Sequence, residues 1–295
     1  KGVRDYIKNM HTPIESKADG LASCKGVYIC NNKNIAFKKC KEINEGKFKS
    51  SRKFVIEEFL SGEEASYFIL SDGKNYKFFG TAQDHKRIGE GDTGPNTGGM
   101  GAYSPSNIIT NKVEEKIKKE IIEPTLKGLK ILGCPFVGIL YAGLIIKDNQ
   151  PKLIEYNIRL GDPECQVLMM RLKTDLLKII TACKKKQINK LAIKWSNKKA
   201  ITIVASSKGY PSKQSKVSEI KNTNKILLNN NQYLFHASTF NKNNRIFTSG
   251  GRVLNATAVN KNLRSGRNTC IDMLKKINWK DKYFRKDIGW RVINS

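Results

Sequence analysis

The sequence predicts a protein of mixed helices and strands, with a large N-terminal part followed by a smaller C-terminal α/β unit. Strand-like and helix-like apolar segments alternate along the 295 residues, a length that suits two domains. Turn signals at Ser71-Asp72-Gly73 and Asp148-Asn149 join neighbouring strands. The composition also changes near residues 185–200, and this change separates the two parts.

Each element follows from its local pattern. In the larger part we expect a short helix over Lys1–Met10, strands over Pro13–Lys17, Val27–Cys30, Ala65–Leu70, Gly138–Ile146 and Lys152–Arg159, and helices over Val113–Leu132 (interrupted by Pro124) and Val167–Ala182. In the C-terminal unit we expect strands over Ala200–Ser206, Tyr233–Ala237, Arg245–Thr248 and Arg252–Val259, and a helix over Asn262–Ile277.

Composition limits the class of protein. The net charge of +28 suggests nucleic-acid binding, but lysines are scattered along the chain, and the run Lys184–Lys186 has no aromatic neighbours. We therefore expect no nucleic-acid partner, although a basic surface attracts phosphorylated metabolites. The apolar run Phe136–Ile146 is too short to span a bilayer, so no membrane partner is expected. The seven cysteines form no CxxC pair, which favours reduced thiols and a cytoplasmic protein.

The segment 85–105, HKRIGEGDTGPNTGGMGAYSP, is the most informative part of the chain. Its glycines alternate with cations, acids and hydroxyl groups, which a simple connector does not need. Glycines let backbone N–H groups approach an anion closely. We interpret this segment as one wall of a site for an anionic ligand. The alternative is a flexible surface loop.

A second signal lies in the expected strand LIEYNIR. Because side chains alternate faces along a strand, Glu155, Asn157 and Arg159 share one face, and Ile154, Tyr156 and Ile158 form the core face. A carboxylate and an amide at this spacing suit Mg²⁺, and the arginine suits a phosphoryl group. The alternative is an edge strand with a polar solvent face. Asp162 and Glu164, which follow at once, weaken that alternative.

Two weaker signals precede these. Lys17 ends a strand before the turn Gly20–Gly26, which suits a nucleotide phosphate, although many exposed strands end in lysine. The segment EEFLSGEE at residues 57–64 has an apolar centre suited to an adenine pocket and acids suited to ribose hydroxyls; a plain acidic turn is the alternative. The residues that we expect to contact the nucleotide are Lys17, Gly20, Lys25, Gly26, Glu57, Glu58, Phe59, Leu60, Glu63 and Glu64.

The order of these four elements resembles that of the ATP-grasp superfamily, and the residues within them resemble those of the phosphoribosylamine–glycine ligase family. The motifs KADGLASCKGV, VIEEFLSGEEAS, QDHKRIGEGDTGPNTGGMGAYSP, NIRLGDPE, SGGRVL and FRKDIGWR carry the resemblance from Pro13 to Arg291. It implies an α+β fold in which two ATP-grasp lobes are followed by a small C-terminal α/β domain. The expected parts are a small lobe over 1–61, a large lobe over 62–190 and a C-terminal domain over 195–295.

The resemblance implies a cytoplasmic, monomeric ligase of purine biosynthesis that joins glycine to 5-phosphoribosylamine. ATP is hydrolysed to ADP and phosphate, and the carboxylate of glycine is activated as glycyl phosphate. Glu155 and Asn157 are then expected to hold Mg²⁺ or Mn²⁺, with Lys17 and Arg159 as catalytic cations. The expected substrate residues are Asp84, Lys86, Arg87, Gly94, Pro95, Asn96, Thr97, Gly98, Gly99, Asp162 and Glu164.

The sequence departs from this family in three ways. We expect the chain to be a fragment without the N-terminal domain of the family, since it begins at Lys1. Cys24 occupies a glycine position in the loop over the phosphates, where a Cβ hinders close approach. Glu15 falls where we expect a core residue, and an unpaired buried carboxylate is costly. These departures keep open an alternative, an inactive ATP-grasp remnant that only binds nucleotide. Leu140–Leu144 also supplies no second carboxylate for the metal.

Overall fold

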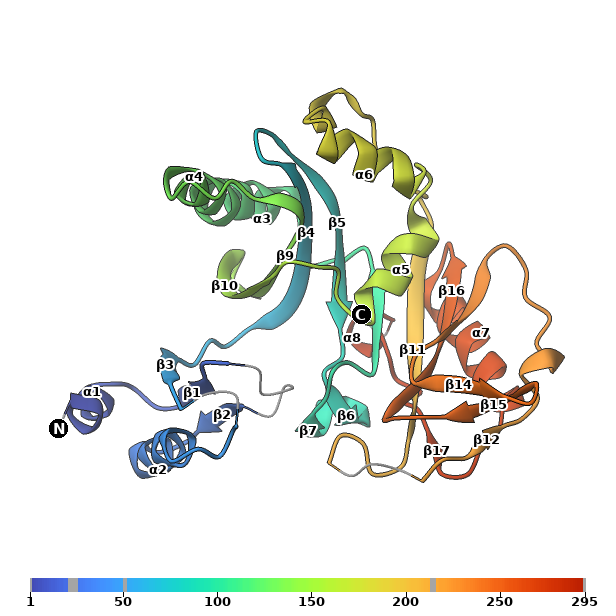
Figure 1. Cartoon of the computed structure of the whole chain (residues 1–295), viewed down its shortest axis with the longest axis horizontal. Helices are drawn as coiled ribbons and strands as arrows, with labels where there is room; N and C mark the ends of the chain where they lie inside the picture. Colours follow the sequence, from blue (N-terminus) through green and yellow to red (C-terminus); the bar gives the residue numbers. More distant parts are fainter. Residues whose placement is uncertain (1, 21–25, 50–51, 213–215, 294–295) are drawn as a thin grey trace. The chain divides into compact units, whose positions relative to one another are not determined.

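The computed structural model describes residues 2–20, 26–49, 52–212 and 216–293. The chain divides into two compact units, Lys1–Ser61 and Gly62–Ser295, which are coloured from blue to red along the sequence (Figure 1). Within the described residues, no helix is both long and apolar enough to cross a membrane.

The first unit is a three-stranded antiparallel sheet in the order β2-β1-β3 with two helices. Its elements are α1 (Gly2–Lys8), β1 (Ile14–Ala18), β2 (Val27–Cys30), α2 (Lys33–Asn44) and β3 (Phe54–Glu58). Helix α2 was not predicted, although Asn32 caps it by accepting from the Ile35 amide. Ile14, Cys30 and Cys40 form part of the core of this first unit.

A nine-stranded sheet runs through the second unit in the order β10-β9-β4-β5-β8-β11-β16-β13, with β17 paired to β11. These strands are β4 (Glu63–Asp72), β5 (Tyr76–Asp84), β8 (Gly101–Ser104), β9 (Val137–Lys147), β10 (Gln150–Asn157), β11 (Lys199–Ser207), β13 (Gln232–His236), β16 (Arg252–Asn260) and β17 (Lys282–Tyr283). The pairing of β8 with β11 joins segments 62–190 and 195–295 in one sheet, so we describe them together.

Shorter elements complete this unit. A hairpin of β6 (Arg87–Gly89) and β7 (Thr93–Asn96) encloses the 3₁₀ turn η1 (Glu90–Asp92), and the turns η3 (Ile188–Lys190) and η4 (Thr223–Lys225) lie in connections. A small sheet has the order β12-β15-β14, with β12 (Glu219–Ile220), β14 (Thr239–Lys242) and β15 (Arg245–Thr248).

Helices cover the sheet on both faces, as Figure 1 shows for the second unit. The α3 (Asn111–Lys116), η2 (Ile117–Ile122) and α4 (Glu123–Ile131) segment packs Val113, Ile117 and Ile122 against Tyr67 and Leu144. Helices α5 (Glu164–Arg171) and α6 (Leu176–Lys184) pack on Phe68 and Phe79 in a separate cluster. Helix α7 (Leu263–Lys276) covers β11 and β16, and α8 (Trp290–Ile293) follows near the chain end.

Most predicted strands are confirmed, and three predictions need correction. The expected helix 167–182 is two helices, because Leu172 leaves the helical conformation and Asp175 caps α6 through the Lys178 amide. The helix 113–132 is not broken at Pro124: its π-helical turn ends before that proline, which sits at the start of α4, where a missing N–H costs little. The strand expected to reach Arg159 ends at Asn157.

Candidate functional site

Four neighbouring strands present polar side chains on one face of the large sheet. The ladder pairs Glu155 with Gly143 and Ser66 with both Gly143 and Ala82. Side chains two residues apart share a face, so the polar residues Glu64, Ser66, Asp84, Tyr141, Glu155 and Asn157 gather on this one. The opposite face carries Tyr67, Ile69 and Leu144 into the apolar core. The alternation of residues along β4, β5, β9 and β10 thus separates a chemical face from a packing face.

A buried acidic pair lies at the centre of this face. Glu164 at the start of α5 is 3% exposed, and the Ser66 hydroxyl lies 3.1 Å from its Oε1 and 2.9 Å from the Tyr141 hydroxyl. Asp84 Oδ1 is buried without a hydrogen-bond partner among the described residues. Burial, and then the nearby charge of Glu164, raises the pKa of Asp84 well above its usual range. A buried carboxyl group with a second one nearby, as Asp84 is here, favours its protonated form or attracts a cation.

The glycine-rich motif closes over this acidic pair. Gly99 has φ +111°, and a Cβ on it would lie 2.7 Å from Asp84 Oδ1 and 2.5 Å from Pro163 Cδ. Gly161 is as close to Glu164, whose Oε2 would be 2.3 Å from a Cβ there. The turn is held by Thr97, which donates to the Lys86 carbonyl and accepts from the Gly99 amide. Glycine is therefore required at position 99, where φ is positive and a Cβ would also meet Pro163, whereas at position 161 a Cβ would press on the end of the Glu164 side chain.

Lys86 and Glu64 form the rim of the same small cavity, which is also lined by Ser66, Asp84 and Tyr141. Lys86 Nζ lies 2.6 Å from Glu64 Oε2. Burial lowers the pKa of Lys86, but Glu64, Tyr141 and Asp84 together raise it by more, so the net shift is upward and the amine stays charged. Glu64 and Asp84 line this cavity with one lysine, and the charge of the buried Glu164 acts on Asp84 from behind Ser66. The cavity is therefore an acidic site that suits a small cationic group.

Two residues from the C-terminal part tie the motif in place, and neither was predicted. Arg252 Nη1 donates to the Gly98 carbonyl at 2.6 Å and to the Asp162 carbonyl at 2.7 Å, while its Nη2 lies 3.0 Å from Asp162 Oδ2. The Tyr210 hydroxyl accepts from the Gly98 amide at 2.8 Å. The sequence held one hint, since Arg252 lies in the quoted motif SGGRVL, but its partners are far away in the chain.

The expected metal residues lie together on β10. Asn157 Nδ2 is 3.4 Å from Glu155 Oε1, so the two side chains point to one place. Gly143, opposite Glu155 in the ladder, also lines the acidic cavity. The side-chain oxygens of the exposed Glu155 and the half-buried Asn157 fit a hard cation that keeps water and phosphate ligands, as Mg²⁺ does. Among the described residues, no cluster of three or more histidine, cysteine or acidic side chains could hold a metal by itself.

The predicted neighbours of the metal pair differ from expectation. Ile158 is 76% exposed and not a core residue, because the strand has already ended at Asn157. Arg159 follows in the bend and is exposed, and its Nη1 donates to the Leu160 carbonyl at 2.9 Å. Asp162 accepts from Gln166 Nε2 as well as from Arg252.

The remaining motif residues form the β6–β7 hairpin. Arg87 Nη1 donates to the Gly94 carbonyl at 2.8 Å and so closes the hairpin. Pro95 and Asn96 are exposed on β7. These four residues therefore shape the motif, whereas Asp84 lines the acidic cavity and Thr97 and Gly99 belong to its cover.

In the first unit, Lys17 lies between two carboxylates. Its Nζ is 2.7 Å from Glu57 Oε2 and 3.4 Å from Glu15 Oε1. The core-facing prediction for Glu15 was wrong: Ser16 points into the core, and Glu15 shares the outer face with Lys17. Burial lowers the pKa of Lys17, but these partners raise it overall. Gly26 is buried and its carbonyl accepts from the Ala18 amide.

The other expected nucleotide residues lie along the following segment. Glu57 and Glu58 end β3, Phe59 is 37% exposed and Leu60 is half-buried. Glu63 and Glu64 begin β4 in the second unit. The expected contacts of Lys25 and the effect of Cys24 lie outside the described residues. The roles of these residues stay predictions.

Comparison with known proteins agrees with this architecture. Residues 1–165 match the model of the phosphoribosylglycinamide synthetase ATP-grasp (A) domain, and residues 200–291 match that of the C domain of the same family. The chain is 45% identical over 292 residues to the phosphoribosylamine–glycine ligase of Brucella melitensis, with 99% of the chain and 68% of that protein covered. It is also 45% identical to the chloroplastic ligase of Arabidopsis thaliana, 56% of which it covers.

Solved structures show the same fold. The phosphoribosylamine–glycine ligase of Thermotoga maritima superposes with a TM-score of 0.88 at 32% identity, over 97% of this chain and 71% of that one. A biotin carboxylase domain from Hydrogenobacter thermophilus superposes at 0.72 and 15% identity, over 99% and 63%. The fold and the match to the ATP-grasp (A) domain model define an ATP-grasp protein. More narrowly, the chain belongs to the phosphoribosylglycinamide synthetase family.

Proposed function

We propose that this chain carries out the ATP-dependent ligation of glycine to 5-phosphoribosylamine, a carbon–nitrogen ligase reaction of purine biosynthesis. Membership of the family supports this reaction. The single structural observation that carries it is the buried acidic pair beneath the glycine-rich motif, with an orphaned oxygen on Asp84. The inactive alternative is not favoured, because the family model and the curated relatives are those of phosphoribosylamine–glycine ligases. Glu15, one of the departures behind that alternative, forms an ion pair with Lys17.

Asp84 and Glu164 are proposed to bind the ammonium group of glycine. A cation there would replace the proton favoured by the raised pKa of Asp84, and it would satisfy Asp84 Oδ1. The backbone of Gly99 lies so close to Asp84 that a side chain at position 99 would press on this carboxylate. Lys86, held by Glu64 at the rim, is left to attract the carboxylate of glycine or the phosphate of the second substrate.

The metal pair and the arginine supply charge neutralisation. Glu155 and Asn157 would hold Mg²⁺ or Mn²⁺, which when bound offsets the negative charge of the ATP phosphates. Arg159, exposed next to this pair, is proposed to bind the phosphoryl group as it passes from ATP to the carboxylate of glycine. The amine of phosphoribosylamine then attacks the acyl carbon and phosphate leaves. Lys17 is proposed to contact an ATP phosphate.

Product formation by the purified protein tests this proposal. With ATP, Mg²⁺, glycine and phosphoribosylamine, the protein should form glycinamide ribonucleotide, ADP and phosphate. Asp84→Asn, which keeps the volume of the side chain but removes its charge, should raise the glycine KM by about tenfold or more, the loss expected when an ionic hydrogen bond is removed. Asp272→Asn is the matched control, since Asp272 is exposed on α7. Absence of glycine-dependent turnover in the wild-type protein would refute the proposal. The cytoplasmic location and monomeric state stay predictions.

A further inference from the structure

The C-terminal segment from Tyr283 to Arg291 lies against the β6–β7 hairpin of the glycine-rich motif. The Tyr283 hydroxyl donates to the Ile88 carbonyl at 2.9 Å, and the Lys286 amide donates to Glu90 Oε1 at 2.9 Å. The Gly91 amide donates to Asp287 Oδ2 at 2.8 Å. Nearly 200 residues separate these partners in the sequence. The hairpin therefore owes its position to the end of the chain and not to its own short ladder.

Asp92 is the centre of this contact. Its Oδ1 accepts from Arg285 Nη1 at 2.9 Å, and its Oδ2 accepts from Arg291 Nη2 at 2.7 Å and Trp290 Nε1 at 3.1 Å. His85 Nδ1 lies 3.4 Å from Oδ1. Burial raises the pKa of Asp92, but these donors outweigh it and the net shift is downward, so the carboxylate stays charged. One acidic side chain of the motif thus binds three residues of the C-terminal segment.

Arg285 makes the contact rigid. Its side chain is fully buried, and it holds Asp287 through two parallel hydrogen bonds of 2.8 and 2.7 Å. It also donates to the Arg87 carbonyl at 3.0 Å. Planar guanidinium–carboxylate pairs of this kind fix orientation as well as charge. Because the guanidinium binds Asp92, Asp287 and the backbone of Arg87 together, it sets the distance between the hairpin and the C-terminal segment.

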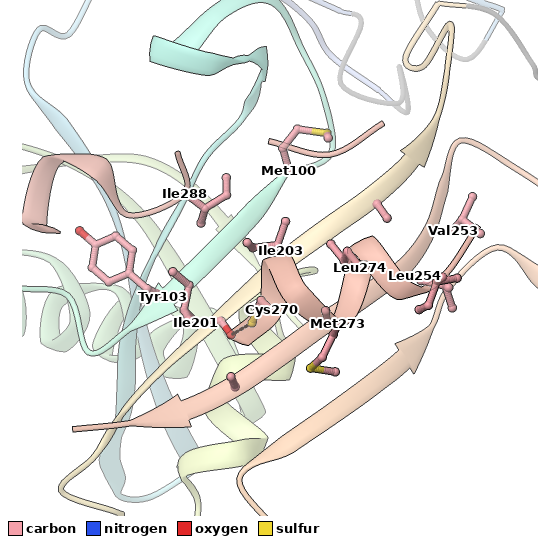
Figure 2. Close-up of a cluster of buried hydrophobic side chains, with 14 of the residues drawn as sticks. Met100, Tyr103, Ile201, Ile203, Val253, Leu254, Cys270, Met273, Leu274 and Ile288 are labelled. Carbon is pink, nitrogen blue, oxygen red and sulfur yellow. Dashed lines mark hydrogen bonds between the residues drawn. The ribbon is translucent and has the colours of Figure 1, made fainter. Parts of the chain in front are cut away.

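Ile288 adds an apolar contact to the same junction. It is fully buried in one core cluster with Met100 and Tyr103, and Figure 2 shows its side chain from the C-terminal segment among these residues of the motif. A Cβ on Gly101 would lie 2.8 Å from Ile288 Cγ1. The segment is therefore packed on the motif as well as hydrogen-bonded to it.

His85 transmits this contact to the substrate residues on either side of it. Asp84 and Lys86 point to the acidic cavity, and His85 between them points to the opposite side. There the Gly289 amide donates to His85 Nε2 at 2.8 Å, which leaves the proton on Nδ1, facing Asp92. The ring is 3% exposed. Asp84 ends β5, and His85 and Lys86 follow it in the connection to β6. A shift of Asp92 or Gly289 should therefore move this connection and with it Asp84 and Lys86.

We propose that Asp92 is a positioning residue, which with Arg285 and Arg291 clamps the C-terminal segment onto the glycine-rich motif and so sets the place of Asp84 and Lys86 in the acceptor pocket. This inference rests on the proposed function for its kinetic consequence only. The clamp would act on glycine and leave ATP unaffected, since none of its contacts involves the residues assigned to the nucleotide.

The kinetic test compares Asp92→Asn and Arg291→Met with the wild-type protein. Asp92→Asn keeps the volume of the side chain but removes the carboxylate that Arg291 and Arg285 share, and Arg285 then keeps only Asp287. Arg291 is 39% exposed, so Arg291→Met removes one partner without emptying the core. We expect Asp92→Asn to raise the glycine KM by about 10- to 100-fold, as when a reacting group is misplaced by a remote change, and Arg291→Met to raise it by less. The ATP KM should stay unchanged. Asp272→Asn, in an exposed ion pair, is the control.

Hydrogen exchange gives a second readout that does not need turnover. In Asp92→Asn the amides of Met100 and Gly289, which donate to the His85 carbonyl and ring, should exchange faster, whereas those of α4 should not. An unchanged glycine KM in an active protein, or unchanged exchange at these amides, would overturn the clamp. Equal rises in the KM of glycine and ATP would also overturn it, because they indicate a general loss of structure. A wild-type protein without glycine-dependent turnover would refute the proposed function alone. The exchange rates of the Met100 and Gly289 amides would then still show whether Asp92 holds the C-terminal segment on the motif.

Discussion

Arg252 on β16 binds Asp162 twice, through the backbone carbonyl at 2.7 Å and through Oδ2 at 3.0 Å. The same guanidinium binds the Gly98 carbonyl at 2.6 Å. One side chain thus connects the glycine-rich motif, the loop before Glu164 and the C-terminal part of the sheet. The position of the acceptor pocket depends on this connection across distant parts of the sequence.

Replacement of Arg252 should therefore weaken the use of glycine. Arg252→Met removes all three hydrogen bonds, and we expect kcat/KM for glycine to fall about 10- to 100-fold, since hydrogen bonds to a charged group contribute about 1.5–3 kcal/mol. Arg252→Lys should be intermediate, because an amine cannot reproduce the planar fork. Steady-state kinetics with glycine varied measure both. Arg245→Met, at an arginine 67% exposed, is the control. Full activity in Arg252→Met would contradict the connection.

Alanine substitutions at Gly99 and Gly128 form a matched pair for testing how the motif packs on Asp84, since they should change the free energy of unfolding in opposite directions. Gly99→Ala places a Cβ 2.5 Å from Pro163 and 2.7 Å from Asp84 at φ +111°, so we expect a loss of about 1–3 kcal/mol in the free energy of unfolding. Gly128→Ala meets nothing within 4 Å in helix α4, and should stabilise the protein by about 0.5–1 kcal/mol. Urea unfolding measures both changes. A neutral effect of Gly99→Ala would show that the motif is not packed on Asp84.

His85 should make stability depend on pH. Burial lowers the pKa of His85. The positive charges of Arg285 and Arg291 lower it further, whereas Asp92 raises it, and the net shift is downward. The Gly289 N–H and the Tyr103 ring also face the imidazole. The unfolded protein therefore binds this proton more readily, and stability is lost as pH falls below about 6.5, by at most about 1.4 kcal/mol per pH unit.

Urea unfolding between pH 8 and pH 5 measures this loss. His85→Gln keeps an acceptor for the Gly289 amide without a titrating ring, so it should flatten the pH dependence. His236→Gln, at an exposed histidine, should leave the dependence as in the wild-type protein. Equal slopes for His85→Gln and the wild type would contradict the neutral, buried state of His85.

Glu155 should control metal-dependent nucleotide binding. Glu155→Ala removes one of two side chains that would hold Mg²⁺, so we expect the Kd for Mg-ATP to rise by more than tenfold, about 1.4 kcal/mol or more. The Kd for ATP without metal should not change. Isothermal titration with and without Mg²⁺ separates the two. Glu120→Ala is the control, because Glu120 is exposed on η2, which covers the other face of the sheet from Glu155. Equal Kd values for Mg-ATP in Glu155→Ala and the wild type would refute the metal assignment.

The sequence predicted local features well and distant contacts poorly. Hairpin signals placed β9 and β10, and Asp148 and Asn149 indeed adopt φ of +51° and +57° between them. Arg159 was placed on a strand because the alternation continues in the letters LIEYNIR, but the pairing register with β9 ends at Asn157. The break before α6 had a signal that we missed, the cap Asp175.

The residues that hold the site together were not predictable in the same way. Ser66, Tyr141 and Arg252 are ordinary residues of strands, and their role depends on which strands are neighbours. Asp92 was part of the glycine-rich motif, but its partners Arg285 and Arg291 lie about 195 residues away. Only the sheet order brings such residues together. The motif FRKDIGWR marked the C-terminal segment without indicating what it binds.

The glycine dependence of ligation in Asp84→Asn tests the central claim most directly. We predict that the wild-type protein forms glycinamide ribonucleotide. In Asp84→Asn, the glycine KM should be about tenfold higher or more, while the ATP KM is unchanged. The same glycine KM in Asp84→Asn and the wild-type protein would contradict the assignment of the acidic cavity to the ammonium group of glycine.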